Sequence, residues 1–475
     1  MQINQSLKLK EKIGYGFGDF ASSMFWKLFS VYLLFFYTDV FGIAAAAAGT
    51  LFLVTRIWDT FLDPIIGVVA DRTNTRWGKF RPFLLWMAVP FAIAGVLTFS
   101  SPDFSATGKL TYAYLTYTLM MMVYSTINVP YASLMGVMTS NIKERTTLAT
   151  FRFVFAFAGS ILVLATVEPL VSALGKTATG ISPGTGWQTS IIIYGIIAAV
   201  LFYFTFAWTH ERIKPPKEQE SSLKADLINL AKNKPWFILL GAGVATLIFN
   251  SLRDGSTIYY FKYYFKNQEA FQLSLFDVAI NYSTLYLVLG QAANIIGVVL
   301  AKPVSDKIGK KNTFLVAMVM ACILSCIFFF FNENNIFLIF LFQFLISICA
   351  GSVFPLLWSM YADIADYSEW KTGRRATGLI FSSSSMSQKL GWTLGGAITG
   401  WLLALWGFKA NMVQAEEARV GIRMMLSFIP AAGALISAIF IIFYTLSDPF
   451  MLKVSDELEE RRIKEGEIND SFPSL

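Results

Sequence analysis

The sequence is poor in charge, in cysteine and in histidine, and each shortage excludes a class of protein. Only 15% of the 475 residues are charged, against about 25% in soluble domains, which argues against a water-soluble globular protein. The cysteines are Cys322, Cys326 and Cys349, all in apolar stretches, so no disulfide framework is expected. The single histidine, His210, lies in a polar stretch, which excludes a proton relay built on histidine.

Apolar residues are what the sequence has in abundance. They make up 55% of the chain, and apolar stretches of about 20 residues, each long enough to cross a bilayer, recur along its whole length. We therefore expect an all-α polytopic membrane protein. Its twelve expected transmembrane helices are residues 17–37, 47–70, 83–99, 110–138, 151–174, 187–209, 237–265, 278–301, 313–331, 336–362, 376–406 and 424–444.

Lysine and arginine gather in alternate connections between these stretches. They are frequent before the first expected span and after the second, fourth, sixth, eighth and tenth, and sparse in the other connections. The positive-inside rule then places both termini in the cytoplasm. The polar, basic start of the chain, residues 1–12, predicts no cleaved signal peptide. The net charge of +7 reflects this orientation signal, so we expect no nucleic-acid partner.

The chain is expected to divide into two six-helix halves. Residues 211–235 are charged, contain two adjacent prolines and read as a cytoplasmic linker between halves 1–210 and 236–446. A weak internal echo supports this division, because similar charged, glycine-containing segments follow the second span (71–81) and the eighth (306–311). Two parallel six-helix repeats are the plan of the major facilitator fold. Residues 447–475 are expected to be a cytoplasmic tail, helical or disordered.

Two carboxylates stand inside the second expected span. Asp59 and Asp63 are one helical turn apart, and Arg56 lies three residues before Asp59. Each such charge costs about 2.5–3.5 kcal/mol at the bilayer centre, so it persists only with partners inside the protein. The pair predicts a site for Na⁺ or for a proton, with Asp59 and Asp63 as metal ligands if the ion is Na⁺. The alternative is an arginine–aspartate pair that only pins helices together, which leaves the second carboxylate unexplained.

The first expected span carries one polar stripe. Asp19, Ser23 and Lys27 recur at intervals of four on an otherwise apolar helix. Lys27 needs an anion, for which Asp59 or Asp63 of the next span is the expected partner. The alternatives are that Asp19 is a helix-end charge and that Lys27 extends to the membrane surface.

Spans four and five add uncharged oxygens and a guanidinium. Tyr124, Ser125 and Asn128 offer hydroxyl and amide groups to a cation or to sugar hydroxyls. The planar donors of Arg152 suit a sugar diol or a carboxylate. The alternatives are helix packing by small polar residues, and a position of Arg152 at the membrane interface.

The eleventh and tenth expected spans add a binding prediction and a gating prediction. Lys389 lies in mid-span, and an intramembrane lysine is a functional candidate. Trp392 follows one turn later as a face on which a sugar ring could stack, although a single tryptophan is more often core. Dense charges at the end of span ten, among them Asp363, Asp366 and Arg374, predict a cytoplasmic gate.

Several of these segments together resemble the glycoside–pentoside–hexuronide:cation symporters, the melibiose-permease family of the major facilitator superfamily. The matching pieces occur in family order: YGFGD at 15–19, YTDVFG at 37–42, RIWDTFLDPIIG at 56–67, RWGKFRP at 76–82, NVPY at 128–131, ADIADYSEWKTG at 362–373 and KLG at 389–391. The resemblance implies uptake of a sugar or glycoside, coupled to H⁺ or Na⁺, by alternating access. It implies no cofactor beyond the coupling ion.

The resemblance also assigns roles to individual positions. Asp59 and Asp63 match the family's cation-site carboxylates, and Ser125 falls where the family often has a hydroxyl ligand. Arg152 and Lys389 match basic positions near the sugar and the cation.

Four positions depart from the family pattern. Ser23 and Asn128 stand where melibiose-permease-type members carry sugar-binding aspartates, and Ala132 stands where they carry a tryptophan, so a melibiose-like substrate is not implied. Leu62 stands where Na⁺-using members carry an asparagine, which weakens the case for Na⁺ against H⁺.

The sequence therefore predicts a monomeric sugar importer. Asp59 and Asp63 hold the cation, and binding of the ion releases either the gating residue Arg56 or Lys27 from the carboxylates. One alternative is a lipid or lysolipid carrier of the same fold, which the polar stripes disfavour. Another is a non-transporting sugar sensor, for which no stretch is long enough to form an output domain. An enzyme is not expected, because no nucleophile–base pair or nucleotide-binding loop is present.

Overall fold

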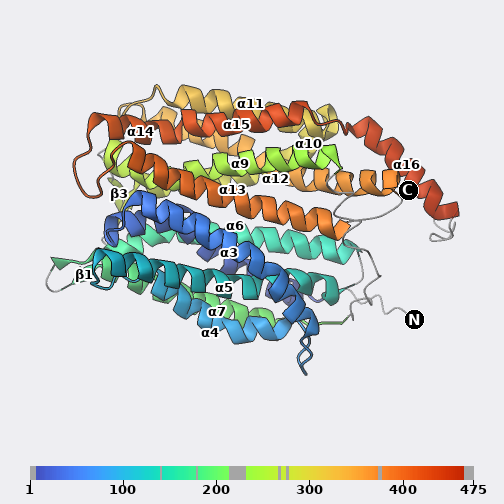
Figure 1. The fold of residues 1–475 in the computed structure, drawn as a ribbon, viewed down its shortest axis with the longest axis horizontal. Coiled ribbons are helices and arrows are strands. Elements are labelled where there is room, and N and C mark those ends of the chain that lie inside the picture. The colour runs from blue at the N-terminus through green and yellow to red at the C-terminus, as the bar shows by residue number, and fades with distance from the viewer. Residues whose placement is uncertain are drawn as a thin grey trace. The chain divides into compact units, whose positions relative to one another are not determined.

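The protein is almost entirely helical in the computed structural model, which describes residues 7–139, 142–177, 180–212, 232–265, 269–273, 278–372 and 377–464 (Figure 1). The first half of the chain contains α1 (Leu9–Lys27), η1 (Leu28–Tyr32), α2 (Leu33–Phe35), η2 (Phe36–Val40), α3 (Ala45–Arg72), α4 (Arg81–Thr98), α5 (Ala106–Met138), α6 (Ile142–Leu174), the two-residue strands β1 (Lys176–Thr177) and β2 (Gly180–Ile181), and α7 (Pro183–Trp208). Here η denotes a π-helical turn.

The second half of the chain is again mainly helical, with a π-helical turn and two short strands between its first two long helices. It contains α9 (Lys234–Tyr259), η3 (Tyr260–Tyr264), the antiparallel strands β3 (Glu269–Leu273) and β4 (Val278–Asn281), α10 (Tyr282–Ile308), α11 (Lys310–Phe328), α12 (Ile336–Thr372), α13 (Thr377–Leu405), α14 (Glu416–Leu426), α15 (Phe428–Ile442) and α16 (Asp448–Lys464).

The all-α membrane architecture is confirmed. Within the described ranges, nine segments are helical, long and apolar enough to cross a membrane. Helices α3, α5 and α13 are long enough as well, with 28, 33 and 29 residues, but they carry the polar groups of the predicted site. The count of twelve spans thus fits the structure, and the reason that three helices are less apolar is that they hold candidate functional residues.

Some element boundaries differ from the sequence prediction. The expected eighth span begins with strand β4, and its helix starts only at Tyr282. The expected last span is interrupted at Ser427, whose φ of −127° and ψ of −93° separate α14 from α15. The tail, predicted as helical or disordered, is helical from Asp448 to Lys464.

The chain folds into two compact units. Unit 1 combines Met1–Lys217 with Ser251–Ala292 and Thr393–Leu426, and unit 2 contains Glu218–Asn250, Ala293–Trp392 and Ser427–Leu475. Segments of the second half thus pack with the first six helices. The predicted division at residues 211–235 stays a prediction.

Unit 1 is built on long neighbouring helices. Helices α4, α5 and α7 run side by side, and α1 packs on α6 and α7 (Figure 1). Small residues let α13 approach α3 closely: a Cβ on Gly49 would lie 2.7 Å from the carbonyl oxygen of Ala397, and Gly400 faces Gly49. The part of α3 that precedes the predicted cation site is therefore held by a backbone contact.

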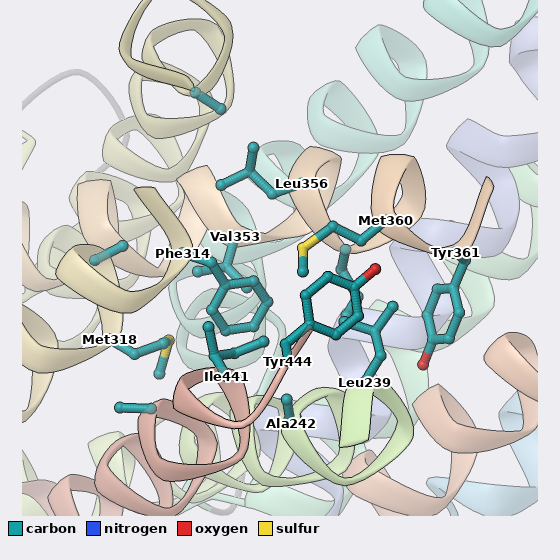
Figure 2. Close-up of a cluster of buried hydrophobic side chains, with 14 of the residues drawn as sticks. Leu239, Ala242, Phe314, Met318, Val353, Leu356, Met360, Tyr361, Ile441 and Tyr444 are labelled. Atoms are coloured by element: carbon teal, nitrogen blue, oxygen red, sulfur yellow. The ribbon is translucent and has the colours of Figure 1, made fainter. Parts of the chain in front are cut away.

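Unit 2 has a hydrophobic cluster between α9, α11, α12 and α15. Figure 2 shows Phe314 and Met318 of α11 facing Ile441 of α15, with Val353 of α12 and Leu239 of α9 beside them. Each of these side chains is buried. Because these side chains come from four helices, the cluster fixes the packing of unit 2.

Candidate functional site

Asp59 is the centre of the predicted cation site. Its side chain is only 1% exposed, and Ser125 Oγ donates a hydrogen bond of 2.6 Å to Asp59 Oδ1. Arg56 Nη1 lies 3.8 Å from Asp59 Oδ2. The structure thus brings together three of the residues singled out in the sequence, from α3 and α5. A carboxylate, a hydroxyl and a guanidinium at this depth form a charged centre shielded from solvent.

Arg56 lies between this carboxylate and two aromatic rings. Its guanidinium carbon is 4.7 Å from the ring centre of Trp26 on α1 and 6.0 Å from that of Tyr117 on α5. Cation–π contacts of this kind stabilise a desolvated guanidinium. Tyr124 continues the aromatic wall, with its ring 6.0 Å from that of Trp26. Arg56 therefore has aromatic partners that remain when Asp59 binds something else.

Asp63 lies on the face of α3 that is directed at α5. Asp59, Asp63 and Gly67 are spaced one turn apart. The first of them contacts Ser125, and the position of a Cβ at the last lies 3.9 Å from Val129. The half-buried Asp63 stands between these two contacts. The structure thus supports a pair of carboxylates on one face, as predicted from the spacing.

A second charged pair joins α1 and α6. Arg152 Nε donates to Asp19 Oδ2 at 2.8 Å, with side chains 31% and 12% exposed. The guanidinium carbon also lies 5.5 Å from the ring centre of Tyr131. That ring stacks on Tyr15 at 4.7 Å, and Tyr131 donates its hydroxyl to the Tyr15 carbonyl. Of the two partners predicted for Arg152, a carboxylate is the one found.

The remaining predicted substrate residues of unit 1 lie on α1 and α5. Asn128 Nδ2 donates to the backbone carbonyl of Tyr124 at 2.9 Å, so part of its hydrogen-bonding capacity is used within α5. Ser23 is half-buried on α1, one turn from Asp19. Lys27, one turn further, donates to Asp254 Oδ2 at 2.7 Å.

Two intramembrane acids, Asp254 on α9 and Glu168 on α6, are not among the residues predicted from the sequence. Asp254 belongs to α9 and pairs with Lys27, for which we had expected Asp59 or Asp63. Glu168 accepts hydrogen bonds from Asn281 and Ser283. Both acids stand inside long apolar stretches, and that signal alone would have identified them as candidates.

The predicted residues of the later spans belong to unit 2. Lys389 and Trp392 are half-buried on α13, and Gly391 between them packs against Leu247 of α9. Lys310 donates to Asp363. Asp366 lines, with these two, a cavity of about 640 Å³. The predicted gating residue Arg374 lies outside the described residues.

Comparison with known proteins identifies the family. The model of the family described as MFS/sugar transport protein matches residues 14–448. The chain is 37% identical to the putative glycoside/cation symporter YagG of Escherichia coli, over 97% of both chains. It is 36% identical to the inner membrane symporter YicJ of the same organism, over 96% of both. It is also 36% identical to the isoprimeverose transporter of Lactiplantibacillus pentosus, over 97% of this chain and 93% of that one.

Solved structures agree on the fold. A bacterial homologue of the human lysosomal transporter Spinster, in an inward-facing and unoccupied conformation, has a TM-score of 0.69 at 12% identity, covering 94% of this chain and 97% of that one. The nucleoside transporter NupG has a TM-score of 0.62 at 15% identity, covering 91% and 98%. The expected major facilitator fold and the resemblance to glycoside–pentoside–hexuronide:cation symporters are both confirmed. The chain belongs to the MFS/sugar transport protein family.

Proposed function

We propose that this protein is a symporter that carries a sugar or glycoside into the cell together with a cation, by alternating access. The observation that carries the proposal is the buried Asp59, hydrogen-bonded by Ser125 and flanked by Arg56 inside a membrane helix. Relatives of 36–37% identity named as a glycoside/cation symporter and an isoprimeverose transporter support the same class of substrate. An intramembrane carboxylate with an exchangeable partner is what a cation-coupled carrier needs.

In this proposal Asp59, Asp63 and Ser125 bind the coupling ion. Arg56 neutralises Asp59 when the ion is absent, and the ion takes its place when bound, leaving the guanidinium on Trp26 and Tyr117. Leu62, an apolar residue between the two acids, adds no oxygen ligand. We therefore propose H⁺ rather than Na⁺ as the ion, since a proton needs only one carboxylate oxygen.

The substrate groups proposed in unit 1 are Ser23, Lys27, Tyr124, Asn128 and Arg152, and those proposed in unit 2 are Lys389 and Trp392 on α13. Hydroxyl, amide and charged donors of this kind hydrogen-bond sugar hydroxyls, while aromatic faces pack on the apolar side of a sugar ring. Coupling follows if the carrier reorients only when empty or fully loaded, because each ligand then binds more tightly in the presence of the other.

We also propose the orientation that the loop charges indicate. Both termini lie in the cytoplasm of a bacterium whose inner membrane the protein spans many times, and residues 211–235 link the two halves. Asp363, Asp366 and Arg374 then lie at the cytoplasmic end, where we propose that the contact of Lys310 with Asp363 belongs to the gate. The protein is proposed to act as a monomer.

The test is uptake by proteoliposomes of a panel of monosaccharides, disaccharides, glycosides and uronides. Each compound is offered under a pH gradient and, separately, under a Na⁺ gradient. We expect one sugar or glycoside to accumulate under the pH gradient. In the Asp59→Asn variant that compound should still exchange across the membrane without accumulating. Accumulation that survives this change would overturn the assignment of Asp59, and folded protein that moves no sugar under either gradient would overturn the function.

A further inference from the structure

Unit 1 contains a cavity of about 280 Å³ at the end where the charge-poor connections lie. Its wall comes from both halves of the chain: from the first half the turns η1 and η2 and helices α6 and α7, and from the second half α9, η3, α10 and the connection between α13 and α14. The residues used below are Tyr32, Asp39, Glu168, Lys262, Asn281, Ser283 and Asn411. None of them takes part in the ion site proposed above.

Glu168 is bonded almost entirely by the second half of the chain. Its Oε2 accepts hydrogen bonds of 2.7 Å from Asn281 Nδ2, at the end of β4, and of 2.7 Å from Ser283 Oγ, in the first turn of α10. Its Oε1 lies 3.5 Å from the hydroxyl of Tyr32. A charged acceptor makes such bonds stronger than a neutral one does. The ionised carboxylate thus ties α6 to the start of α10.

Asp39, at the end of η2, repeats this arrangement on the other side of the cavity. Lys262 Nζ lies 2.6 Å from Asp39 Oδ1, and Tyr263 donates its hydroxyl to the same oxygen. Asn411 Nδ2 donates to the backbone carbonyl of Asp39 at 2.6 Å, and Asn411 Oδ1 accepts from Lys262 at 2.8 Å. One acid of the first half therefore holds three residues of the second.

The two sets of bonds divide the residues between the halves of the chain in the same way. Both acids come from the first half, while Lys262, Tyr263, Asn281, Ser283 and Asn411 all come from the second. All of these residues except Tyr263 line the cavity, and their polar groups bond to each other. The cavity is therefore better described as a joint between the two halves than as a second sugar site.

We propose that Glu168 is a further proton-binding site and that its protonation releases this joint. An ionised carboxylate accepts from Asn281 and Ser283 together, whereas a protonated one has a donor in place of part of its acceptor capacity. Protonation removes the negative charge that strengthens both bonds, and a proton on Oε2 also takes up acceptor capacity that the two donors use. Lower pH therefore favours opening of this end, and higher pH favours its closure.

The other charged groups around Glu168 are joined in ion pairs. Asp39 is paired with Lys262, and the Lys27–Asp254 pair lies at the same junction of α1 with α9. The hydroxyl of Tyr32 faces Glu168 itself. The proposal rests on the proposed transport function only for the orientation of the protein in the membrane. With the charge-poor end outside, an acidic exterior opens the carrier toward the sugar.

The test measures opening directly, without sugar or membrane gradient. The three native cysteines are replaced, and Ile258→Cys, at a buried position of the cavity wall on α9, becomes the reporter in purified full-length protein in detergent. Its rate of reaction with a maleimide is measured from about pH 8 down to about pH 5, a range that spans the upper part of glutamate titration in proteins. Each rate is divided by that of Thr107→Cys, an exposed position in the first turn of α5, to remove the intrinsic pH dependence of the thiol.

We expect the normalised rate to rise about fivefold or more as the pH falls, the lower end of couplings between two sites. Glu168→Gln should react fast at every pH, because the amide cannot ionise. Glu168→Asp should keep a pH dependence, which separates loss of titration from loss of folding. Asp103→Asn, an exposed carboxylate in the connection between α4 and α5, should behave like the background protein.

A rate independent of pH in the background protein would overturn the proposal, as would a pH dependence that survives in Glu168→Gln. The maleimide reaction involves no sugar. A protein that fails to transport sugar can therefore still show the predicted pH dependence, and a protein without that pH dependence can still transport sugar.

Discussion

The ion pair of Asp19 with Arg152 allows an experiment to separate two roles of Arg152, stabilising the fold and binding sugar. If Arg152 only stabilises the fold, removing both charges together should be nearly neutral. If it also binds sugar, the double variant should stay folded and lose substrate. We expect Asp19→Asn alone to destabilise the protein by about 1–3 kcal/mol, since a partly buried guanidinium loses its carboxylate. The double variant Asp19→Asn, Arg152→Gln should unfold at the same temperature as the parent protein, but its sugar uptake should not recover.

Thermal unfolding in detergent and substrate affinity are measured on the same preparations for this pair. The conservative variant Arg152→Lys keeps a charge for Asp19 but loses the planar donors. It should therefore retain most of the stability and show weakened binding. Recovery of full uptake in the double variant would assign the pair to the fold alone.

Ser125 offers a direct test of the cation site. Its hydroxyl gives Asp59 a hydrogen bond of 2.6 Å in a buried position, and leaving a buried acceptor unsatisfied costs about 1–3 kcal/mol. In Ser125→Ala, we expect the coupling-ion concentration for half-maximal uptake to change about tenfold, equivalent to about 1.4 kcal/mol. Thr126→Ala, whose hydroxyl bonds only its own helix at Met122, is the matched control. An unchanged ion dependence in Ser125→Ala would remove this residue from the site.

At the scale of elements, two glycines in different surroundings predict opposite effects on stability when each is replaced by alanine. One of them, Gly400, lies where α13 approaches α3 closely. A Cβ on Gly400 would lie against the backbone of Ala45 and Gly49, which cannot move aside as a flexible side chain could. Among the described residues, no atom lies within 4 Å of the Cβ position of Gly136 on α5. Gly136→Ala should stabilise the protein by up to about 1 kcal/mol through helix propensity, and Gly400→Ala should destabilise it.

Because α3 carries Asp59, Gly400→Ala should reduce uptake as well as the midpoint of thermal unfolding. Both variants are measured by thermal unfolding and by uptake. A Gly400→Ala protein as stable as the parent would mean that α3 and α13 can separate without consequence.

The sequence predicts the arrangement of residues within one helix, but not which residues of distant helices come into contact. Spacing along one helix predicts which residues share a face, and Asp59, Asp63 and Arg56 lie as expected. Partners on distant helices depend on topology, so the bond of Lys27 to Asp254 could not be read from spacing. The break at Ser427 is marked only by the serine at the N-cap position and by Pro430 three residues later, signals that an apolar run through residues 424–444 outweighs. The π-helical turn that begins at Leu28 has no proline to mark it.

At the scale of the whole molecule, alternating access requires that each end close firmly enough to seal and weakly enough to open. In unit 1, under the proposed orientation, Asp39 with Lys262 and Glu168 with Asn281 and Ser283 supply the closing bonds at the outer end. Removing one of them should shift the balance toward the open state without touching the sugar or ion groups. Since about 1.4 kcal/mol changes a population ratio tenfold, a single lost bond is enough to alter the cycle.

Lys262→Met tests this balance. Asp39 keeps the hydroxyl of Tyr263 and loses its ammonium partner, so outer closure weakens. Exchange of sugar across the membrane needs only the loaded carrier, whereas net uptake also needs the empty carrier to return. We expect the ratio of exchange to net uptake to rise about fivefold or more, in line with couplings of 1–3 kcal/mol. Lys409→Met, an exposed lysine of the connection between α13 and α14, should leave the ratio unchanged. An equal loss of exchange and net uptake in Lys262→Met would contradict a gating role, because it would place the lysine in the path of the sugar.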